Sequence, residues 1–416
     1  MTTPAVTVRI AEELDRFVAT DEIVWAGEEI PGTAARFGAT VAQDQRFAAF
    51  TGHDPAEGHA GIYGVYSLRL GLPGGAVPQV AGLTWVGVHP DLRRRGVLTA
   101  MMRDHLARCR DVGQPLSILH ASEQGIYGRF GYGEAATGLK VVLGRGATLT
   151  APYLDAEATA LTTRTVSARL EGVTERIRAL AMAQAATYPG TVVGDTALMA
   201  QIGQDRPEEL RGRETVRVLF AQADGVDVGC AALRRLPEWT NSRPGGSVVT
   251  AHVYGPPAAR LALAKRLVDL DLMASTTFAP VAADTELLDW VGGPFSAAEV
   301  VPHDATWVRL VDVAAAWELR SYDAECNVVV EVADRHAPWN AGRWRLAASG
   351  GRGTATRTND AAEVTLAVEA LGAAFLGRNT HHLLGNGLVA EHRPGAYAEL
   401  TRAMRTDRDP SPAMMF

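Results

Sequence analysis

Apolar side chains recur every three or four positions in the segment that follows Gly96, and this spacing predicts an amphipathic helix. The apolar positions are Val97, Leu98, Met101, Met102, His105, Leu106 and Cys109. Apolar-rich segments around this helix have the length and composition of strands: Arg46–Thr51, Gly61–Leu70, Gly82–Val88 and Leu116–His120. A strand, a tight turn, a helix and another strand in this order form a βαβ unit.

A similar order of strand and helix patterns returns between about residues 160 and 300. The predicted helices are Leu170–Ala185 and Ala258–Met273, the second opened by Pro256 and Pro257. The predicted strands are Thr215–Ala221, Val228–Arg235 and Ser247–Tyr254, with a long turn over Leu236–Gly246. This repetition indicates a coarse internal duplication. The polar, Thr- and Ala-rich stretch Gly146–Thr165 is the predicted linker between the two copies.

Residues 303–416 form a third predicted unit, which mixes the two kinds of pattern. Its strands are predicted at Val328–Val332, Gly342–Ala347 and Ala362–Val368, and its helices at Val313–Leu319, Val368–Leu376 and Pro394–Met404. We therefore expect a mixed α/β (α+β) protein with units at 1–150, 151–302 and 303–416. At about 150 residues for each domain, a chain of 416 residues fits this division.

Composition narrows the class of protein and its partners. A hydrophobic content of 47% excludes a disordered, collagenous or coiled-coil chain, and a net charge of −7 disfavours nucleic acid and anionic membranes. Three widely spaced cysteines, no signal peptide and no apolar run of about 20 residues predict a soluble, cytoplasmic protein. His381 and His382 lack a convincing third ligand, so we expect no metal site.

The strongest chemical signal is the turn Arg93-Arg94-Arg95-Gly96, which joins a strand to the amphipathic helix. The first amides of a helix have no partner inside the helix, and the helix dipole places positive charge there. A glycine at this point removes the Cβ that would obstruct a large anion, so the turn can cradle a pyrophosphate. The alternative is a solvated basic turn. No Gly-Lys-Ser/Thr follows, and the GxGxxG pattern is absent.

This turn resembles the acetyl-CoA turn of the GNAT acetyltransferase superfamily, whose pattern is Arg/Gln-x-x-Gly-x-Gly/Ala. Arg93 and Gly96 match it, while Leu98 departs at the last position. Together with a second block, His120-Ala-Ser-Glu-Gln-Gly-Ile-Tyr-Gly-Arg-Phe-Gly-Tyr-Gly133, it resembles the Eis (enhanced intracellular survival) family of bacterial N-acetyltransferases. The resemblance implies tandem GNAT folds, the second degenerate, then a sterol-carrier-like domain and a hexameric assembly. The helix entry at Tyr254-Gly255-Pro256 fits a second unit that no longer binds cofactor.

The resemblance also assigns roles to individual residues. The strand that pairs with the acetyl-pantetheine arm matches Val86, Gly87 and Val88, and further cofactor contacts match Ser122 and Glu123. The pyrophosphate turn matches Arg94, Arg95, Gly96, Val97, Leu98 and Thr99. Tyr127 matches the general acid that protonates the departing thiolate, and the carboxylate of the last residue, Phe416, matches the general base.

The reaction explains why a base and an acid are required. A protonated amine cannot attack a thioester until it loses a proton, and the leaving thiolate then needs one. His120 is an alternative base, although a lone histidine at a strand end is more often a structural residue. We expect Phe130 and Tyr132 to be packing aromatics; alone, Tyr127 would be read in the same way.

Other residues bear on the acceptor. Trp85 corresponds to an aromatic that flanks the family's substrate pocket, where it would stack on a substrate or simply pack. Acidic residues near the start either line a pocket for cationic amines or form a solvated helix face: Glu12, Glu13, Asp15, Asp21, Glu22, Glu28 and Glu29. Well-known aminoglycoside-acetylating members carry glutamate just before the terminal aromatic, and Met415 here weakens that substrate class.

We therefore expect an acetyl-CoA-dependent N-acetyltransferase that uses direct transfer in a ternary complex. Its acceptors are expected to be primary amines of small polycationic molecules, similar to aminoglycosides or polyamines, and its assembly a homohexamer. One alternative is a lysine acetyltransferase acting on proteins. Another is a non-catalytic protein whose third unit binds a lipid while the N-terminal site only senses CoA.

Overall fold

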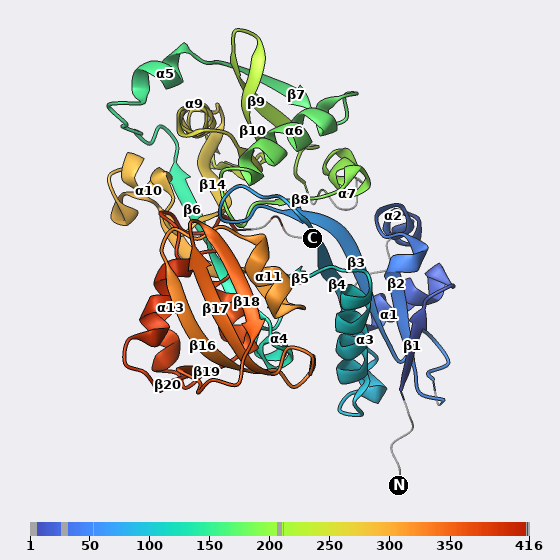
Figure 1. Cartoon of the computed structure of the whole chain (residues 1–416). Coiled ribbons are helices and arrows are strands. Elements are labelled where there is room, and N and C mark those ends of the chain that lie inside the picture. The colour runs from blue at the N-terminus through green and yellow to red at the C-terminus, as the bar shows by residue number, and fades with distance from the viewer. Residues whose placement is uncertain are drawn as a thin grey trace.

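The computed structural model describes residues 6–25, 32–52, 54–205, 210, 212–412 and 414. The first unit contains a mixed sheet with helices α1 (Leu14–Trp25) and α2 (Thr33–Thr40) near one side and α3 (Val97–Asp111) along the other (Figure 1). A short helix, α4 (Gln124–Tyr127), follows the sheet's fifth strand. The strands are β1 (Thr7–Ile10), β2 (Arg46–Phe50), β3 (Gly61–Leu70), β4 (Gln79–Val88), β5 (Leu116–Leu119) and β6 (Gly133–Gly144).

Helix α3 confirms the predicted periodicity. Its buried residues are Val97, Met101, Met102, His105, Leu106 and Cys109, while Leu98 is half-buried. Arg108 and Arg110 lie in the last turn, where positive charge complements the helix dipole. Strands β4 and β5, which precede and follow α3, pair in parallel, as a βαβ crossover requires.

The second unit repeats this arrangement. Its strand β13 (Gly246–Tyr254) and strand β14 (Met273–Ala282) pair in parallel, and helix α9 (Pro257–Val268) connects them. The remaining elements are α5 (Asp155–Ala160), β7 (Thr162–Ser167), α6 (Val173–Ala185), β8 (Val192–Val193), α7 (Thr196–Ala200), β9 (Arg217–Ala223), β10 (Val226–Leu236), α10 (Glu286–Trp290) and β15 (Glu299–Leu310).

One 13-stranded sheet runs through both copies, in the order β1-β2-β3-β4-β5-β15-β6-β14-β13-β10-β9-β7, with β8 on β3. Strand β15 lies between β5 and β6, and it spans the expected boundary between residues 302 and 303. The divisions at 150 and 302 remain predictions. They mark changes in the sequence pattern, whereas the hydrogen-bonded sheet continues across both positions.

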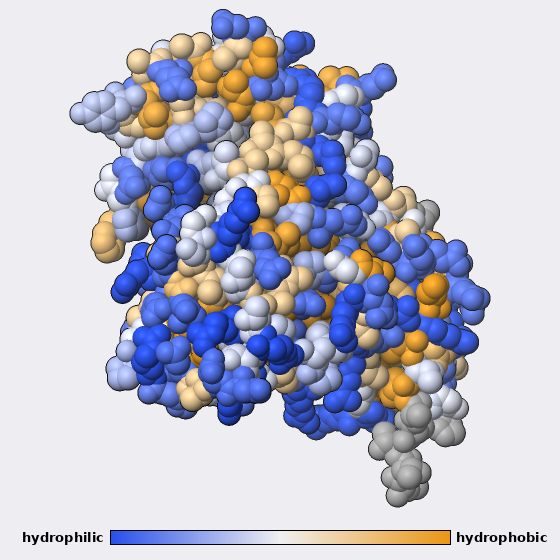
Figure 2. Space-filling view, in the orientation of Figure 1, coloured by the Kyte–Doolittle hydropathy of each residue, from blue (hydrophilic) through white to orange (hydrophobic). Residues whose placement is uncertain are grey.

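The third unit is a five-stranded sheet with helices against it (Figure 1). Its elements are α11 (Val313–Leu319), β16 (Cys326–Ala333), β17 (Gly342–Ser349), β18 (Arg352–Arg357), β19 (Val364–Ala367), α12 (Val368–Ala374), β20 (Val389–Glu391) and α13 (Ala396–Met404). The outer face of β17 and β18 is largely hydrophilic (Figure 2). The inner face shares one apolar cluster with the first unit, in which Phe17 and Leu68 join Trp317 and Phe375.

The structure corrects three expectations. The predicted linker Gly146–Thr165 contains α5 and the start of β7, which pairs with β9. The predicted turn Leu236–Gly246 contains a short hairpin, β11 (Trp239–Thr240) and β12 (Arg243–Pro244). The helix predicted over Ala258–Met273 ends at Val268, where Asp269 leaves the helical conformation; Leu272 is left-handed and Met273 begins β14.

Candidate active site

The site begins where strands β4 and β5 separate. They pair only at Ala81 with Ser117 and at Gly82 with Ile118, although β4 continues to Val88. Opposite β3, the register of β4 shifts around Trp85, whose φ of 53° marks a β-bulge. Beyond Gly82, the edge of β4 that faced β5 is therefore available to pair with an extended ligand.

A cleft of about 900 Å³ opens beside this edge. It is lined by every predicted cofactor residue that the structure describes except the exposed Arg95: Val86, Gly87, Val88, Arg94, Gly96, Val97, Leu98, Thr99, Ser122 and Glu123. Val24 of α1 lies against Gly87, so that α1 forms part of a second wall. The volume is at the upper end of the range for ligand pockets, which suits a long cofactor.

Gly96 shapes the floor of the cleft at the start of α3. Its φ of 83° lies in the left-handed region, and a Cβ added there would meet no protein atom within 4 Å. The first intrahelical bond joins the Ala100 amide to the Gly96 carbonyl, which leaves the amides of Val97, Leu98 and Thr99 outside the helical ladder. This helix entry has the geometry of an anion site.

Tyr127 lies at the end of α4 in the wall of the same cleft. Burial, with a smaller contribution from Glu123, raises the pKa of its phenol to about 12. The group therefore stays protonated at neutral pH and can donate a proton. Its ring makes an edge contact with Tyr132, with 6.1 Å between the centroids.

The aromatic neighbours of Tyr127 differ from one another. Tyr132 is fully buried, and its hydroxyl lies 2.8 Å from Ser117 Oγ, which in turn lies 2.8 Å from His105 Nε2. This chain of hydrogen bonds agrees with the expected structural role. Phe130 is also buried, but it lines the cleft.

The glycines after Tyr127 serve contacts with the third unit. A Cβ on Gly133 would lie 2.0 Å from the Glu369 carbonyl oxygen, and one on Gly131 would lie 2.6 Å from Val368 Cγ1. Helix α12 thus approaches the backbone of the second sequence block directly. Arg309 Nε also donates to the Phe130 carbonyl, at 2.9 Å. These contacts hold the segment that carries Tyr127 against the third unit.

Several residues of the cleft were missed by the sequence analysis. Val24, Trp25, Arg129, Arg335 and His336 line it, and the last two come from the loop between β16 and β17. No motif signals Arg335 and His336, because they approach the first unit only through tertiary packing; Arg129 lies in the second sequence block, but no role was assigned to it. The third unit therefore contributes directly to the wall of the cleft.

The chain's last described residue contacts His120, two residues before Ser122 in the wall of the cleft. His120 Nε2 lies 2.9 Å from the Met414 carbonyl oxygen. Before it, the Asp409 amide donates to Asp284 Oδ2 and the Ser411 amide donates to the Pro189 carbonyl, at 2.8 and 2.7 Å. Phe416 and Met415 lie outside the described residues, as do Glu28 and Glu29.

On the acceptor side, Trp85 Nε1 donates to the Tyr66 hydroxyl at 3.1 Å, and its ring centroid lies 6.4 Å from that of Phe17. Burial raises the pKa of Asp21 on α1 to about 6, and Glu22 adds to the shift. Among residues whose placement is described, no cluster of three His, Cys, Asp or Glu side chains is arranged to hold a metal. Over the same ranges, no helix has the length and apolar character to cross a membrane.

Comparisons with known proteins identify the units. A family model for the acetyltransferase (GNAT) domain matches residues 8–135, and one for the sterol carrier protein domain matches residues 313–412. An uncharacterized N-acetyltransferase of Streptomyces avermitilis is 38% identical over 347 residues, which cover 82% of this chain and 83% of the relative. N-acetyltransferase Eis of Mycobacterium tuberculosis is 30% identical over 360 residues, which cover 83% of each chain.

A solved structure supports the same assignment over the whole chain. The crystal structure of Eis1 from Mycobacterium abscessus superposes with a TM-score of 0.80 at 26% sequence identity, and covers 99% of this chain and 100% of its own. The GNAT domain carries the cleft just described, and this fold implies the use of acetyl-CoA. The chain is therefore an N-acetyltransferase of the GNAT superfamily and belongs to the Eis family.

Proposed function

We propose that the protein transfers the acetyl group of acetyl-CoA to primary amines of small polycationic molecules, by direct attack in a ternary complex. One observation carries the proposal: the open edge of β4, the helix entry at Gly96 and Tyr127 all line one cleft. Acetyl-CoA supplies a thioester, whose acyl carbon accepts the amine. Val86, Gly87 and Val88 would pair with its pantetheine arm, and Arg94, Arg95 and the amides of Val97, Leu98 and Thr99 would hold the pyrophosphate.

The chain's own groups would then move two protons. A carboxylate at Phe416 would take a proton from the acceptor ammonium, and burial would raise its pKa from about 3.5 and so its basicity. The bond between Met414 and His120 supports a terminus directed at the cleft. The Tyr127 phenol would give its proton to the departing thiolate and regain one from the attacking nitrogen, which loses its second proton as the amide forms. Ser122 and Glu123, which line the cleft beside Tyr127, would contact the cofactor.

Asp21 supports a cationic acceptor. Its carboxyl is largely buried on α1, four residues before Trp25 in the wall of the cleft. Binding an ammonium group near it would stabilise the ionised form and lower its raised pKa. The resemblance places a glutamate at the position of Met415 in aminoglycoside-acetylating members, and its absence here weakens the aminoglycoside-like class of acceptor.

A panel of acceptors tests the proposal. The purified protein is mixed with acetyl-CoA and, separately, with linear polyamines, aminoglycosides and a lysine-containing protein, and thiol release is followed. We expect release that depends on a small polyamine and is absent without an amine. Release only with the lysine-containing protein as acceptor would instead identify a protein lysine acetyltransferase. No release with any amine would contradict catalysis.

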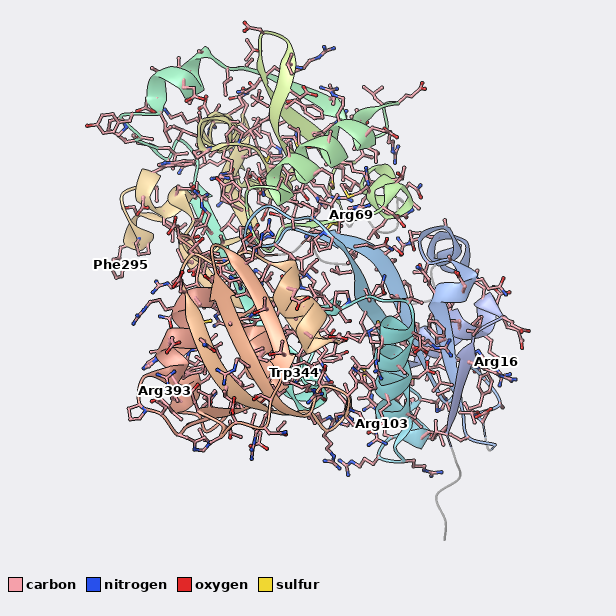
Figure 3. All side chains as sticks on the ribbon, viewed as in Figure 1. Arg16, Arg69, Arg103, Phe295, Trp344 and Arg393 are labelled. Carbon is pink, nitrogen blue, oxygen red and sulfur yellow. The ribbon has the colours of Figure 1, made fainter. Side chains whose placement is uncertain are left out.

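We also propose a cytoplasmic homohexamer with closed point symmetry. Large apolar side chains exposed on the second unit support an assembly: Tyr153, Leu170, Val226, Trp239, Leu272 and Phe295. Phe295 projects away from the fold (Figure 3). Cys109, Cys230 and Cys326 are buried free thiols, as in a reducing compartment. Light scattering should give six times the mass of one chain; a monomer across the micromolar range would contradict it.

A further inference from the structure

The helix entry accounts for only part of the negative charge on CoA, which carries a 3′-phosphate on its ribose besides the pyrophosphate. We propose that Arg129 of the first unit and Arg335 of the third unit bind this 3′-phosphate, so that the sterol-carrier-like unit completes the cofactor site. The inference rests on the proposed use of acetyl-CoA. It concerns a different group of the cofactor from the one at Gly96.

The charge of the cleft supports a second phosphate. Four arginines line it, Arg93, Arg94, Arg129 and Arg335, and the described lining contains one carboxylate, that of Glu123. In the described part of the chain, no carboxylate forms an ion pair with any of the four. A positive cleft on a chain of net charge −7 is suited to a ligand with several negative charges.

Some arginines elsewhere on the protein do have carboxylate partners. Arg108 bonds to Asp104 at 2.7 Å, and Arg345 bonds to Asp360 at 2.5 Å, although both pairs are partly exposed. These two arginines have carboxylate partners, whereas no carboxylate pairs with the four arginines of the cleft among the residues that the structure describes. Arginines with free guanidinium forks match the geometry of a phosphate group.

Phe130 brings the two proposed arginines together. The Arg129 guanidinium carbon lies 5.0 Å from the centroid of the Phe130 ring, and the His336 ring centroid lies 4.9 Å from the same point. Arg335 is the neighbour of His336 in the chain. Arg129 and His336 therefore contact one aromatic ring from different units, and Arg335, the chain neighbour of His336, lines the same cleft.

The loop that carries Arg335 is held firmly by Asp334. This buried carboxylate accepts from the amides of His336 and Ala337, at 3.1 and 2.9 Å, and from Arg309 Nη2, at 2.7 and 2.8 Å. Arg309 also bonds to the Phe130 carbonyl. The same ion pair thus positions both sides of the proposed subsite, which is what a preorganised binding site requires.

His336 provides an independent observation. It is 9% exposed and lines the cleft, yet its Nδ1 is buried and has no hydrogen-bond partner. Nearly all buried polar atoms of folded proteins have one, so His336 is one of the few side chains with an unpaired buried atom in the described part of the chain. Arg103 on α3, labelled in Figure 3, acts electrostatically on His336 and adds positive charge beside the subsite.

Binding of CoA and of 3′-dephospho-CoA, measured by calorimetry, tests the proposal. The wild-type protein should bind CoA at least tenfold more tightly than it binds 3′-dephospho-CoA. Arg335→Ala and Arg129→Ala should each weaken CoA binding about tenfold to a hundredfold, and change 3′-dephospho-CoA binding less than about twofold. Arg352→Ala is the control, because it removes an exposed arginine of the same unit that lies outside the cleft lining.

The outcomes separate this inference from the proposed function. Loss of discrimination in both variants, with normal discrimination in Arg352→Ala, supports the subsite. Equal weakening toward both ligands would place the arginines on the pyrophosphate and overturn it. Unchanged affinity in the variants, or equal affinity of the wild type for both ligands, would also overturn the proposed 3′-phosphate subsite. If the wild type binds neither ligand, the proposed use of acetyl-CoA fails as well.

Discussion

The imidazole Nε2 of His120 lies 2.9 Å from the carbonyl oxygen of Met414, a residue 294 positions later in the chain. A carbonyl oxygen can only accept a hydrogen bond, so this ring nitrogen carries the proton. A nitrogen that already carries a proton cannot accept another. The contact therefore makes Nε2 of His120 a positioning group for the end of the chain and argues against its use as the base.

Adding one glycine after Phe416 should strongly lower kcat and leave acetyl-CoA binding nearly unchanged. The added residue moves the carboxylate by one position, and no side chain can replace it. Steady-state kinetics combined with calorimetry measure the two quantities separately. Phe416→Ala is the matched variant and should lose less activity, since it keeps the carboxylate. Near-normal turnover in the extended chain would show that this carboxylate is not the base.

Gly96→Asp should weaken acetyl-CoA binding while the fold survives. Its side chain would project into open space, so it would meet the cofactor's phosphates rather than the protein. Left-handed backbone geometry adds a cost of about 1 kcal/mol for a residue with a Cβ. Gly96→Asn is the control, because asparagine has the same shape, tolerates this conformation and carries no charge.

Repulsion between the aspartate and the cofactor's phosphates predicts that Gly96→Asp binds acetyl-CoA at least tenfold more weakly than Gly96→Asn at low salt. The difference in affinity between the two variants should decrease as salt is added. Calorimetric titration at two salt concentrations measures both effects. If both variants bind as tightly as the wild type, the phosphates lie elsewhere.

Tyr127→Phe should lower kcat about a hundredfold without changing acetyl-CoA affinity, since only the proton donor is removed. Because the folded pKa of the phenol is raised to about 12, the group is protonated at every pH well below that value. The loss should therefore be the same at pH 6 and at pH 9. A wild-type decline near pH 9 that disappears in Tyr127→Phe would contradict the raised pKa.

Where a buried face repeats at a regular period, the sequence predicted the element, although it missed strand β6, whose residues Ala135, Val141 and Leu143 are buried. Helix α3 and strand β3 follow this rule, because a buried face imposes a period of 3.6 or 2 on the residues. Strand β7 escaped prediction because Thr162–Thr165 are exposed and the strand is recognisable only by its pairing with β9. Strand β18 (Arg352–Arg357) was not predicted for a similar reason, since only Gly353 and Ala355 of this strand are buried.

The candidate site also contains residues that the sequence predicts and residues that it does not. Its cofactor side follows from local motifs, because the strand, turn and helix that form it are contiguous in the chain. Arg335 and His336 follow from no local pattern, since only the packing of the third unit against Phe130 brings them to the cleft. The motif glycines were recognised, but the sequence alone does not show that Gly131 and Gly133 accommodate α12.

Gly133→Ala tests whether the second block is built for that packing. The new Cβ would lie 2.0 Å from the Glu369 carbonyl oxygen and 2.3 Å from the Ala373 amide nitrogen, both backbone atoms of α12 that cannot rotate away. We expect a loss of more than about 3 kcal/mol in the free energy of unfolding, at the upper end for overpacking of a core. Urea denaturation measures it.

Gly125→Ala is the matched control for this clash. It lies in the same block, and its added Cβ would meet no atom within 4 Å. Its stability should change by less than about 0.5 kcal/mol and could rise slightly, because alanine is favoured over glycine in a helix. Equal stability of the two variants would mean that α12 does not press against the block. Because Arg335 reaches the cleft from the same unit, Gly133→Ala should also reduce acetyl-CoA affinity under conditions in which it remains folded, whereas Gly125→Ala should not.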